Sequence, residues 1–566
     1  MDFGGKMFIT FINLIPFKLL RLWYSNCYTG NVYISIKMKF PYITLKKNSY
    51  PVFILLFCLL TVTIQSCKKK RSDMANILFK RTQNKVFKNL DPDDFAVVFQ
   101  HVLDSDKTNL TNPVRIKTYY INNDYDPALF LAYYQSGDFN TMLSYFDKAD
   151  EHGLDSNMFQ PQQIRALAAK FYSKNGIKTL DEAYHDMAQL ELLSANSLIN
   201  YTNYLKFGLI NPKRIYSRYF MATKRPDSTS IKQALQARNL KVYLDTIQPK
   251  DPQYKILQKA YLSGTVITGL SKDESQRLLL ISMERLRWQN KPSEVKYVLV
   301  NIPDFKLDVM DSGKSVLNMK VCVGQGRNMD NAKTLIKFDD TDRVDKPNPH
   351  ETPLLNSVIH SVQVNPVWNI PESIANKEIM VEAAKDPYYL ANKNIDVYKN
   401  GDKIPDPETI DWSTADKSAF EFKQKPGADN SLGKIKFLFN NRSNVYLHDT
   451  PAKLAFYKTM RAVSHGCVRL GNPEGLALAL FGQTDDYNTI DADMKSDNPT
   501  PTDIDLPNKT AVYITYNTCW ADSTGTIQYR PDVYGLDIVL YAHMEKILDN
   551  VKTNGTSGSM TKLAAR

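Results

Sequence analysis

A cysteine and a histidine in the last third of the chain have the residue types and spacing that acyl transfer requires. Cys467 lies in the run Ser464-His465-Gly466-Cys467-Val468-Arg469, and His448 precedes it by 19 positions. Acyl transfer through sulfur needs a nearby base, hydrogen-bond donors for the oxyanion of the tetrahedral intermediate, and elements that hold these groups together. Cys467 is therefore a candidate nucleophile.

The segments around these residues are suited to bringing them together. His448 ends a strand-like run that begins at Val445, and Asp449-Thr450-Pro451 then turns the chain away. The segment 453–462 is long enough for a helical crossover, which would return the chain so that nucleophile and base lie side by side. Glycine at 466 leaves the backbone unobstructed, so the Gly466 and Cys467 amides are the candidate oxyanion donors.

Two histidines compete for the role of base. His465 lies two positions before Cys467, on the same face if the segment is extended, so adjacency alone favours it. We expect His448 and the positive charge of Arg469 to lower the pKa of the thiol. Taken singly, such residues are more often structural, His448 as a turn residue and Arg469 as a surface ion-pair partner. Their combination favours catalysis.

The spacing resembles that of the YkuD-type L,D-transpeptidases, whose signature is a histidine, a short interval and then Ser/Thr-His-Gly-Cys. Here 15 residues lie between His448 and Ser464. Further stretches extend the resemblance over about residues 90–550, to the large branch with an N-terminal helical scaffold domain. They are Met283–Trp288, Val300–Pro303, Asn365–Pro371, Gln424–Gly427, Asn430–Phe437 and Tyr446–Pro451.

The resemblance implies an α+β fold, in which a helical scaffold domain is followed by a mainly β catalytic domain with a capping-loop insertion. It implies that Cys467 is the nucleophile and that His448 is the proton donor and acceptor, oriented by the backbone carbonyl of Asp449. His465 then becomes a supporting residue, which reverses what adjacency suggests. The implied substrate-binding residues are Tyr446, Ser464, Arg469 and Asn472.

The implied reaction is acyl transfer on peptidoglycan stem peptides, with a thioester at Cys467, loss of D-Ala and formation of a 3–3 cross-link. No metal or organic cofactor is implied, and carbapenems are expected to acylate Cys467. Three alternatives stay open: an L,D-carboxypeptidase, attachment of protein to the wall by the same nucleophile, and a non-catalytic envelope-binding lipoprotein. A papain-like protease is disfavoured, because its cysteine precedes its histidine.

Composition and periodicity predict two domains. The chain has 566 residues, of which 43% are hydrophobic and 23% charged, as in globular proteins too long for one core. Helical spacing dominates 86–288, where Thr179–Glu182 has the form of a capping box and Pro212 is expected to stop the helix. From 289 to 566 the pattern is mainly β, with expected strands at 297–302, 317–324, 358–364, 434–439, 444–448 and 511–516.

The polar segment 373–429 interrupts this β pattern. A connection of this length is either a lid over a site or a disordered surface insertion, and the resemblance equates it with the substrate-capping loop. Relatives often carry a peptidoglycan-binding module between the two domains. The interval between Leu257 and Met283 is too short for one, so wall recognition would fall to the scaffold, the capping loop or a lipid tether.

Positive charge is concentrated at the N-terminus, where residues 1–70 account for +9 of the formal charge of +11. This distribution excludes nucleic acid as a partner, because a phosphate-binding face needs its cations on the folded domain. Residues 38–67 match a lipoprotein-type signal: lysines, an apolar run over 51–64, and Cys67 as the lipidated residue. The run of about fourteen residues is shorter than the about 20 that span a bilayer.

We therefore expect export to the cell envelope (periplasm), with a membrane tether through lipidated Cys67 or a signal anchor. Residues 1–37 are either an over-long start or an extra anchor, and 68–85 form a polar tether. The six cysteines have neither a disulfide framework nor zinc spacing. Cys322 and Cys519 either pair or are buried strand cysteines, and the second reading is favoured. Cys467 is then a lone thiol in an oxidising compartment.

Overall fold

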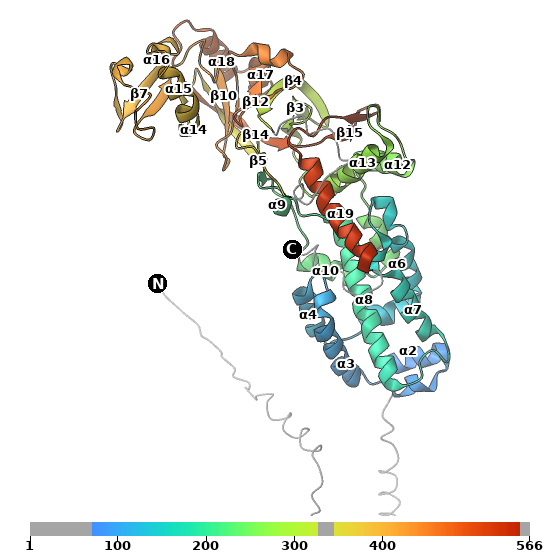
Figure 1. Cartoon of the computed structure of the whole chain (residues 1–566). Coiled ribbons are helices and arrows are strands. Elements are labelled where there is room, and N and C mark those ends of the chain that lie inside the picture. Colours follow the sequence, from blue (N-terminus) through green and yellow to red (C-terminus); the bar gives the residue numbers. More distant parts are fainter. Residues whose placement is uncertain (1–70, 327–343, 555–566) are drawn as a thin grey trace, which may run out of the picture. The chain divides into compact units, whose positions relative to one another are not determined.

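The computed structural model describes residues 71–326 and 344–554, which comprise a helical region followed by a mainly β region (Figure 1). This arrangement confirms the α+β prediction. The prediction of a signal over 38–67, with Cys67, lies outside the described residues. Most of the predicted polar tether over 68–85 is not a tether, because Asp73–Thr82 forms a helix that buries Ala75 and Leu78. None of the helices within the described ranges combines the length and the apolar character needed to cross a membrane.

The helical region is organised around one long central helix, α8 (Leu180–Phe207), whose side chains are buried on nearly every side. Helices α3, α5, α7, α10, α11 and α13 all contact it. The elements of this region are α2 (Asp73–Thr82), η1 (Lys85–Asn89), α3 (Pro92–Ser105), η2 (Asp106–Asn109), α4 (Pro113–Ile121), α5 (Ala128–Ser136), α6 (Asp138–Phe146), η3 (Ala149–His152), η4 (Ser156–Phe159), α7 (Pro161–Tyr172), α8, α9 (Pro212–Ile215), α10 (Ser228–Leu235), α11 (Leu240–Ile247), α12 (Pro252–Leu262) and α13 (Lys272–Arg287).

The start of α8 follows its sequence signal, whereas its end does not. The Thr179 hydroxyl accepts a hydrogen bond from the Glu182 amide at 3.1 Å, as the capping pattern predicts. The helix stops at Phe207 because Gly208 takes a positive φ of 78°, four positions before Pro212. Pro212 instead begins the short helix α9.

The β region is built on a sheet that closes on itself. Its strand order is β1-β5-β10-β11-β13-β4-β3-β2-β14, β12 adds to β4, and β14 pairs with β5 as well as with β2. The strands are β1 (Tyr219–Phe220), β2 (Lys296–Asn301), β3 (Lys306–Asp311), β4 (Lys314–Gly324), β5 (Leu354–Val364), β10 (Ile435–Phe439), β11 (Leu447–His448), β12 (Ala462–Ser464), β13 (Val468–Leu470) and β14 (Thr502–Thr515).

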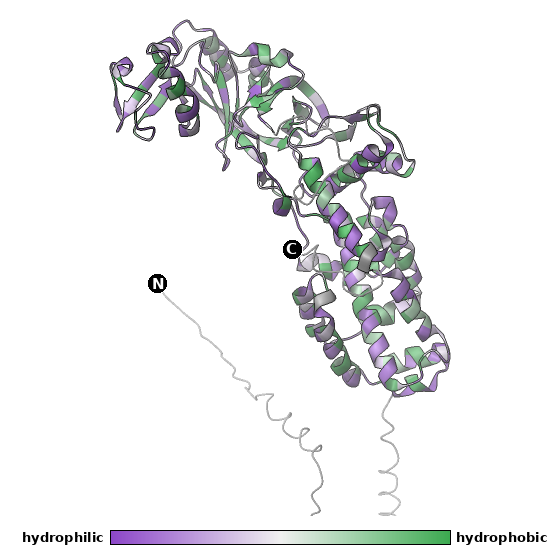
Figure 2. Cartoon of the chain, viewed as in Figure 1, coloured by the Kyte–Doolittle hydropathy of each residue, from purple (hydrophilic) through white to green (hydrophobic). Residues whose placement is uncertain are grey.

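Alternate residues of these strands point to the two faces of the sheet. The inner face forms an apolar core in which Val362, Phe437, Leu447 and Val468 are completely buried. Helices α17 (Pro473–Phe481) and α18 (Asp485–Lys495) follow β13, and the one-turn helix η9 (Lys453–Tyr457) follows β11. Figure 2 shows hydrophobic and hydrophilic residues interleaved along strands and helices, as expected for elements that bury one face.

The segment between β5 and β10 is folded, so a disordered insertion is excluded for it. It forms the sheet β6-β9-β7-β8 with its own core, which includes Val397, Trp412 and Phe422. Its elements are β6 (Trp368–Asn369), α14 (Glu372–Ile374), the π-helix η7 (Ala375–Ile379), α15 (Met380–Ala383), α16 (Tyr389–Asn392), β7 (Ile395–Lys399), β8 (Asp402–Lys403), η8 (Pro407–Thr409) and β9 (Glu421–Gln424). We call this segment the capping segment.

The last described helix returns to the helical region. After the hairpin β15 (Cys519–Ala521) and β16 (Ile527–Tyr529), helix α19 (Leu536–Asn554) packs against α13 and α9 (Figure 1). Cys322 and Cys519 are buried, unpaired thiols in β4 and β15, as the favoured reading of these cysteines predicts.

Candidate active site

Strand pairing brings the predicted base next to the predicted nucleophile. β11 and β13 run parallel, with His448 opposite Arg469 and Leu447 opposite Val468. Tyr446 and Cys467 each precede these pairs by one position, and the Val468 amide donates to the Tyr446 carbonyl at 3.1 Å. The connection between the strands is not the helical crossover that was expected, because it contains only η9 and then β12.

The neighbouring strands extend this pairing into a polar row on the outer face of the sheet. Lys436 of β10 is paired with His448, and Cys322 of β4 with Arg469. The flanking residues Phe437, Leu447 and Val468 point the other way, into the core. We use the name site row for Lys436, His448 and Arg469 of this row together with Cys467, which lies two positions before Arg469.

His448 is held in one tautomer. It is only 4% exposed, and its Nδ1 lies within hydrogen-bond distance of the Asp449 carbonyl oxygen. Because a carbonyl can only accept, Nδ1 carries the proton and Nε2 keeps the lone pair that a base needs. Burial, reinforced by the charge of Arg469, lowers the pKa of His448 to about 4, although the Asp449 carbonyl acts in the opposite direction.

The thiol is neutral as well, contrary to the expectation that its pKa would be low. Burial raises the pKa of Cys467 to about 11 and outweighs the lowering effects of the Tyr446 amide and hydroxyl, Arg469 and Lys436. At neutral pH the site therefore holds a thiol and an uncharged imidazole. A base must remove the thiol proton as the sulfur attacks.

The two cations of the site row are poorly compensated. Burial lowers the pKa of both Lys436 and Arg469. Arg469 Nε is buried and has no hydrogen-bond partner among the described residues. The Lys436 ammonium lies 5.6 Å from the centroid of the Tyr446 ring. A buried donor without a partner inside a protein is rare, and Arg469 lies only two positions after the candidate nucleophile.

The loop before Cys467 is fixed by its own hydrogen bonds. The Ser464 hydroxyl donates to the Cys467 carbonyl oxygen at 2.6 Å and accepts from the Gly466 amide at 3.3 Å. Gly466 has a φ of +118°, a conformation that favours glycine. Since the Gly466 amide already has an acceptor, the candidate oxyanion donor is the Cys467 amide. Ser464 therefore shapes the loop.

His465 faces the capping segment. Its Nε2 pairs with Glu378 Oε1 of η7 at 2.5 Å, and its ring centroid lies 4.4 Å from that of His350. His448, in contrast, belongs to the site row. The geometry thus separates the two histidines, one beside the sheet cations and one at the contact with the capping segment.

The remaining predicted residues differ in placement. The Tyr446 ring packs edge-on against His448 at 5.7 Å, so it lies in the site. The Asn472 side chain accepts from the Gly475 amide at 2.9 Å and caps α17. Sequence reasoning missed Lys436 and Glu378. Alternation along β10 could have placed Lys436, but no local signal connects Glu378 to His465.

Comparisons with known proteins match two parts of the chain. Residues 295–513 match the family model of the L,D-transpeptidase catalytic domain (YkuD), and residues 114–260 match that of the Scaffold domain. A protein of Haemophilus influenzae named "Putative L,D-transpeptidase" is 29% identical over 335 residues. The matched part spans 57% of this chain and 61% of that relative. The chain thus contains a YkuD-type L,D-transpeptidase catalytic domain, preceded by a Scaffold domain.

Proposed function

We propose that this protein is a peptidoglycan L,D-transpeptidase that forms 3–3 cross-links through a thioester at Cys467. The pairing of β11 with β13 is the observation that carries the proposal, since it puts the buried neutral imidazole of His448 beside the strand that Cys467 directly precedes, close to two cations. The family match and the name of the relative support the same reaction class.

In the first half-reaction, Cys467 Sγ attacks the carbonyl carbon of the third stem residue while His448 Nε2 takes the thiol proton. The developing oxyanion accepts a hydrogen bond from the Cys467 amide. Collapse of the tetrahedral intermediate breaks the C–N bond to D-Ala, and His448 returns the proton to the leaving amine. The product is a thioester on Cys467 and free D-Ala.

In the second half-reaction, the side-chain amine of another stem peptide attacks the thioester carbon. His448 removes a proton from this amine, and the departing thiolate of Cys467 takes up a proton, which restores the thiol. If water attacked the thioester in place of the amine, the same residues would catalyse an L,D-carboxypeptidase reaction. If an amine of a protein attacked it, that protein would become attached to the wall.

Arg469 and Lys436 are assigned to the substrate, because their positive charges beside Cys467 suit the carboxylates of a stem peptide, and Arg469 Nε has no partner among the described residues. The capping segment touches the loop of Cys467 through the pair of His465 and Glu378, so we assign it the role of a lid over the bound stem. A carbapenem would acylate Cys467 in the same way as the donor stem.

We also propose that the protein acts in the cell envelope, tethered to the membrane by lipidated Cys67 or by a signal anchor. The lysines, the apolar run and Cys67 within 38–67 support this location. Mass spectrometry of the mature N-terminus would test it, since an acylated Cys67 should be the first residue.

Incubation of the full chain with disaccharide-tetrapeptide tests the proposed reaction. We expect release of D-Ala and tetrapeptide–tripeptide dimers in mass spectra, and neither from the Cys467→Ala variant. Tripeptide monomers without dimers would indicate that water, and not a second stem peptide, accepts the acyl group, which would overturn transpeptidation in favour of hydrolysis. Unchanged substrate with both proteins would overturn the enzymatic assignment and favour a binding protein.

A further inference from the structure

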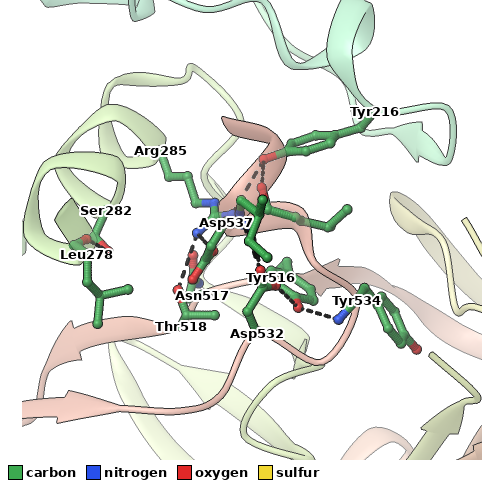
Figure 3. A network of polar contacts seen from close by, with 12 residues as sticks. Tyr216, Leu278, Ser282, Arg285, Tyr516, Asn517, Thr518, Asp532, Tyr534 and Asp537 are labelled. Atoms are coloured by element: carbon green, nitrogen blue, oxygen red, sulfur yellow. Dashed lines mark hydrogen bonds and ion pairs between the residues drawn. The ribbon is translucent and has the colours of Figure 1, made fainter. Parts of the chain in front are cut away.

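A continuous chain of buried hydrogen bonds connects the helical region to the loop of the nucleophile. It begins at Arg285 of α13, whose Nη1 donates to Asp537 Oδ1 at 2.5 Å and to Thr518 Oγ1 at 3.3 Å. Figure 3 shows this first part, in which Arg285, Asp537 and Thr518 face one another. The side chains of Arg285 and Asp537 are 6% and 2% exposed, so water competes little for this contact.

The next links pass through two tyrosines. The Asp537 amide donates to Asp532 Oδ2 at 2.9 Å, and the Tyr516 hydroxyl donates to Asp532 Oδ1 at 2.5 Å. The Tyr534 amide then donates to the Tyr516 hydroxyl at 2.7 Å (Figure 3). Each group in this series therefore fixes the orientation of the next.

The last links reach the backbone beside Cys467. The Tyr534 hydroxyl donates to the Gly324 carbonyl at 2.8 Å and accepts from the Thr352 amide at 3.1 Å. The Thr352 hydroxyl accepts from the Gly324 amide at 2.8 Å and donates to the Gly466 carbonyl at 2.8 Å. Thr352 thus ties the end of β4 to the residue before the nucleophile.

The close approach of these segments leaves little room for a shift. A Cβ atom on Gly324 would lie 1.9 Å from the carbonyl oxygen of His350, so only glycine allows the 350–352 backbone to pack there. Thr352 is 1% exposed and Tyr534 is also 1% exposed. The position of the Thr352 hydroxyl is accordingly set by backbone on both sides.

The bond from Thr352 determines where the candidate oxyanion donor points. In a trans peptide, the carbonyl of one residue and the amide N–H of the next point in opposite directions. Anchoring the Gly466 carbonyl on Thr352 therefore turns the Cys467 N–H away from Thr352. We propose that Thr352 and Tyr534 are positioning residues that aim the Cys467 amide at the oxyanion, and that Arg285 anchors them to the helical region.

This inference rests on the proposed acyl transfer, and its test compares two reactions of the same sulfur. Release of D-Ala passes through an oxyanion, whereas alkylation of Cys467 by iodoacetamide displaces iodide and forms none. The Thr352→Val variant keeps the shape of the side chain but removes the hydroxyl. We expect the rate of acyl transfer to fall about 10- to 100-fold, which is at most comparable to the fall caused by removing a whole oxyanion donor. The rate of alkylation of the Cys467 peptide should stay within about 2-fold of that of the unmodified chain.

Two further variants make this result specific. Thr352→Ser keeps the hydroxyl and should restore most of the acyl transfer. Tyr534→Phe removes the two hydrogen bonds of this hydroxyl, to the Gly324 carbonyl and from the Thr352 amide, but keeps the bond from Thr352 to Gly466. We therefore expect a smaller loss of acyl transfer, again with unchanged alkylation. If Thr352→Val unfolds in a thermal melt, Tyr534→Phe decides the question by the same two measurements.

The outcomes separate the inference from the function on which it rests. If the unmodified chain releases D-Ala and both variants match it, the positioning role is wrong and the proposed function stands. A parallel fall in acyl transfer and alkylation would also overturn the positioning role, because it would indicate general disruption of the site. If the unmodified chain forms no thioester, the proposed function itself fails, and the inference with it.

Discussion

This protein has two clusters of buried polar residues, and they differ in whether their arginine is paired with a carboxylate. In the first, the junction cluster, Arg285 of the helical region meets Asp537, Asp532 and Thr518 near the chain end. In the second, the site row, Arg469 Nε lacks a partner among the described residues, and burial lowers the pKa of Lys436. The arginine of the first cluster is paired with the Asp537 carboxylate, whereas Arg469 in the second cluster keeps an unpaired donor among the described residues.

The pKa directions reflect this difference. Burial disfavours the charge of Arg285, but the Asp537 carboxylate more than compensates and raises the pKa of the guanidinium. In the site row burial prevails and lowers the pKa of Arg469, Lys436 and His448. In a structural cluster a buried cation is paired with a carboxylate of the protein. Buried cations with lowered pKa values, in contrast, are typical of a site that binds a charged substrate.

Removing the imidazole of the site row should have the largest effect. His448→Ala leaves a thiol of high pKa without a base, so we expect acyl transfer to fall about 10²- to 10⁴-fold. Carbapenem thioester formation, followed by intact-mass spectrometry, measures it. His465→Ala is the matched control and should lose far less. If His465→Ala abolished thioester formation and His448→Ala did not, the base would have to be reassigned.

Breaking the junction cluster should cost stability. Arg285→Met leaves the buried carboxylates of Asp537 and Asp532 without their cation, so we expect a loss of about 3–5 kcal/mol in the free energy of unfolding. Denaturant titration measures it. Lys241→Met removes the cation of an exposed pair with Asp245 and should change stability by less than about 1 kcal/mol. Equal effects of the two substitutions would contradict the neutralisation of the junction cluster.

Acid should weaken the folded protein in part through the site row. The pKa of His448 in the folded protein, about 4, lies below the ordinary histidine value of 6.5, so its contribution to stability is complete above pH 6.5 and is lost as the pH falls through 4. The shift corresponds to about 3 kcal/mol. Unfolding free energies between pH 7 and pH 4, compared with those of His448→Gln, isolate this contribution. Identical pH profiles of the two proteins would refute the depressed pKa.

The smallest effect on stability is expected from Arg469→Met, which is the counterpart in the site row of Arg285→Met in the junction cluster. Because the Arg469 guanidinium is buried with an unpaired Nε, its replacement should change the unfolding free energy by less than about 1 kcal/mol, or even raise it. Acyl transfer should fall nonetheless, since a proposed substrate cation is lost. A loss of stability as large as that of Arg285→Met would remove the contrast between the clusters.

Local signals predicted much of the fold. The cap at Thr179 marks the start of α8, and alternation marks most strands of the closed sheet. The end of α8 was misplaced because a proline is a visible stop, whereas the left-handed turn at Gly208 depends on packing. The crossover over 453–462 was misjudged because length alone does not distinguish a helix from a short 3₁₀ turn followed by a strand.

For the candidate site, the sequence predicted the two motif residues but not the contacts around them. Cys467 and His448 belong to a motif with a fixed interval, so one reading of the chain finds them. The role of Ser464 in holding its loop, and that of Asn472 as a helix cap, emerged only from hydrogen-bond partners. Lys436 requires the register of β10 against β11, which is set by the closed sheet.

The residues that can do chemistry here can be read from the chain alone, because a nucleophile, a base and their interval are properties of the sequence. Folding sets their protonation: desolvation raises the pKa of Cys467 to about 11 and lowers that of His448 to about 4, against the expectation of a low thiol pKa. Folding also decides what steadies the nucleophile. Thr352 and Gly466 are 114 residues apart, and Arg285 and Asp537 are 252 apart, so these contacts exist only after the chain has folded.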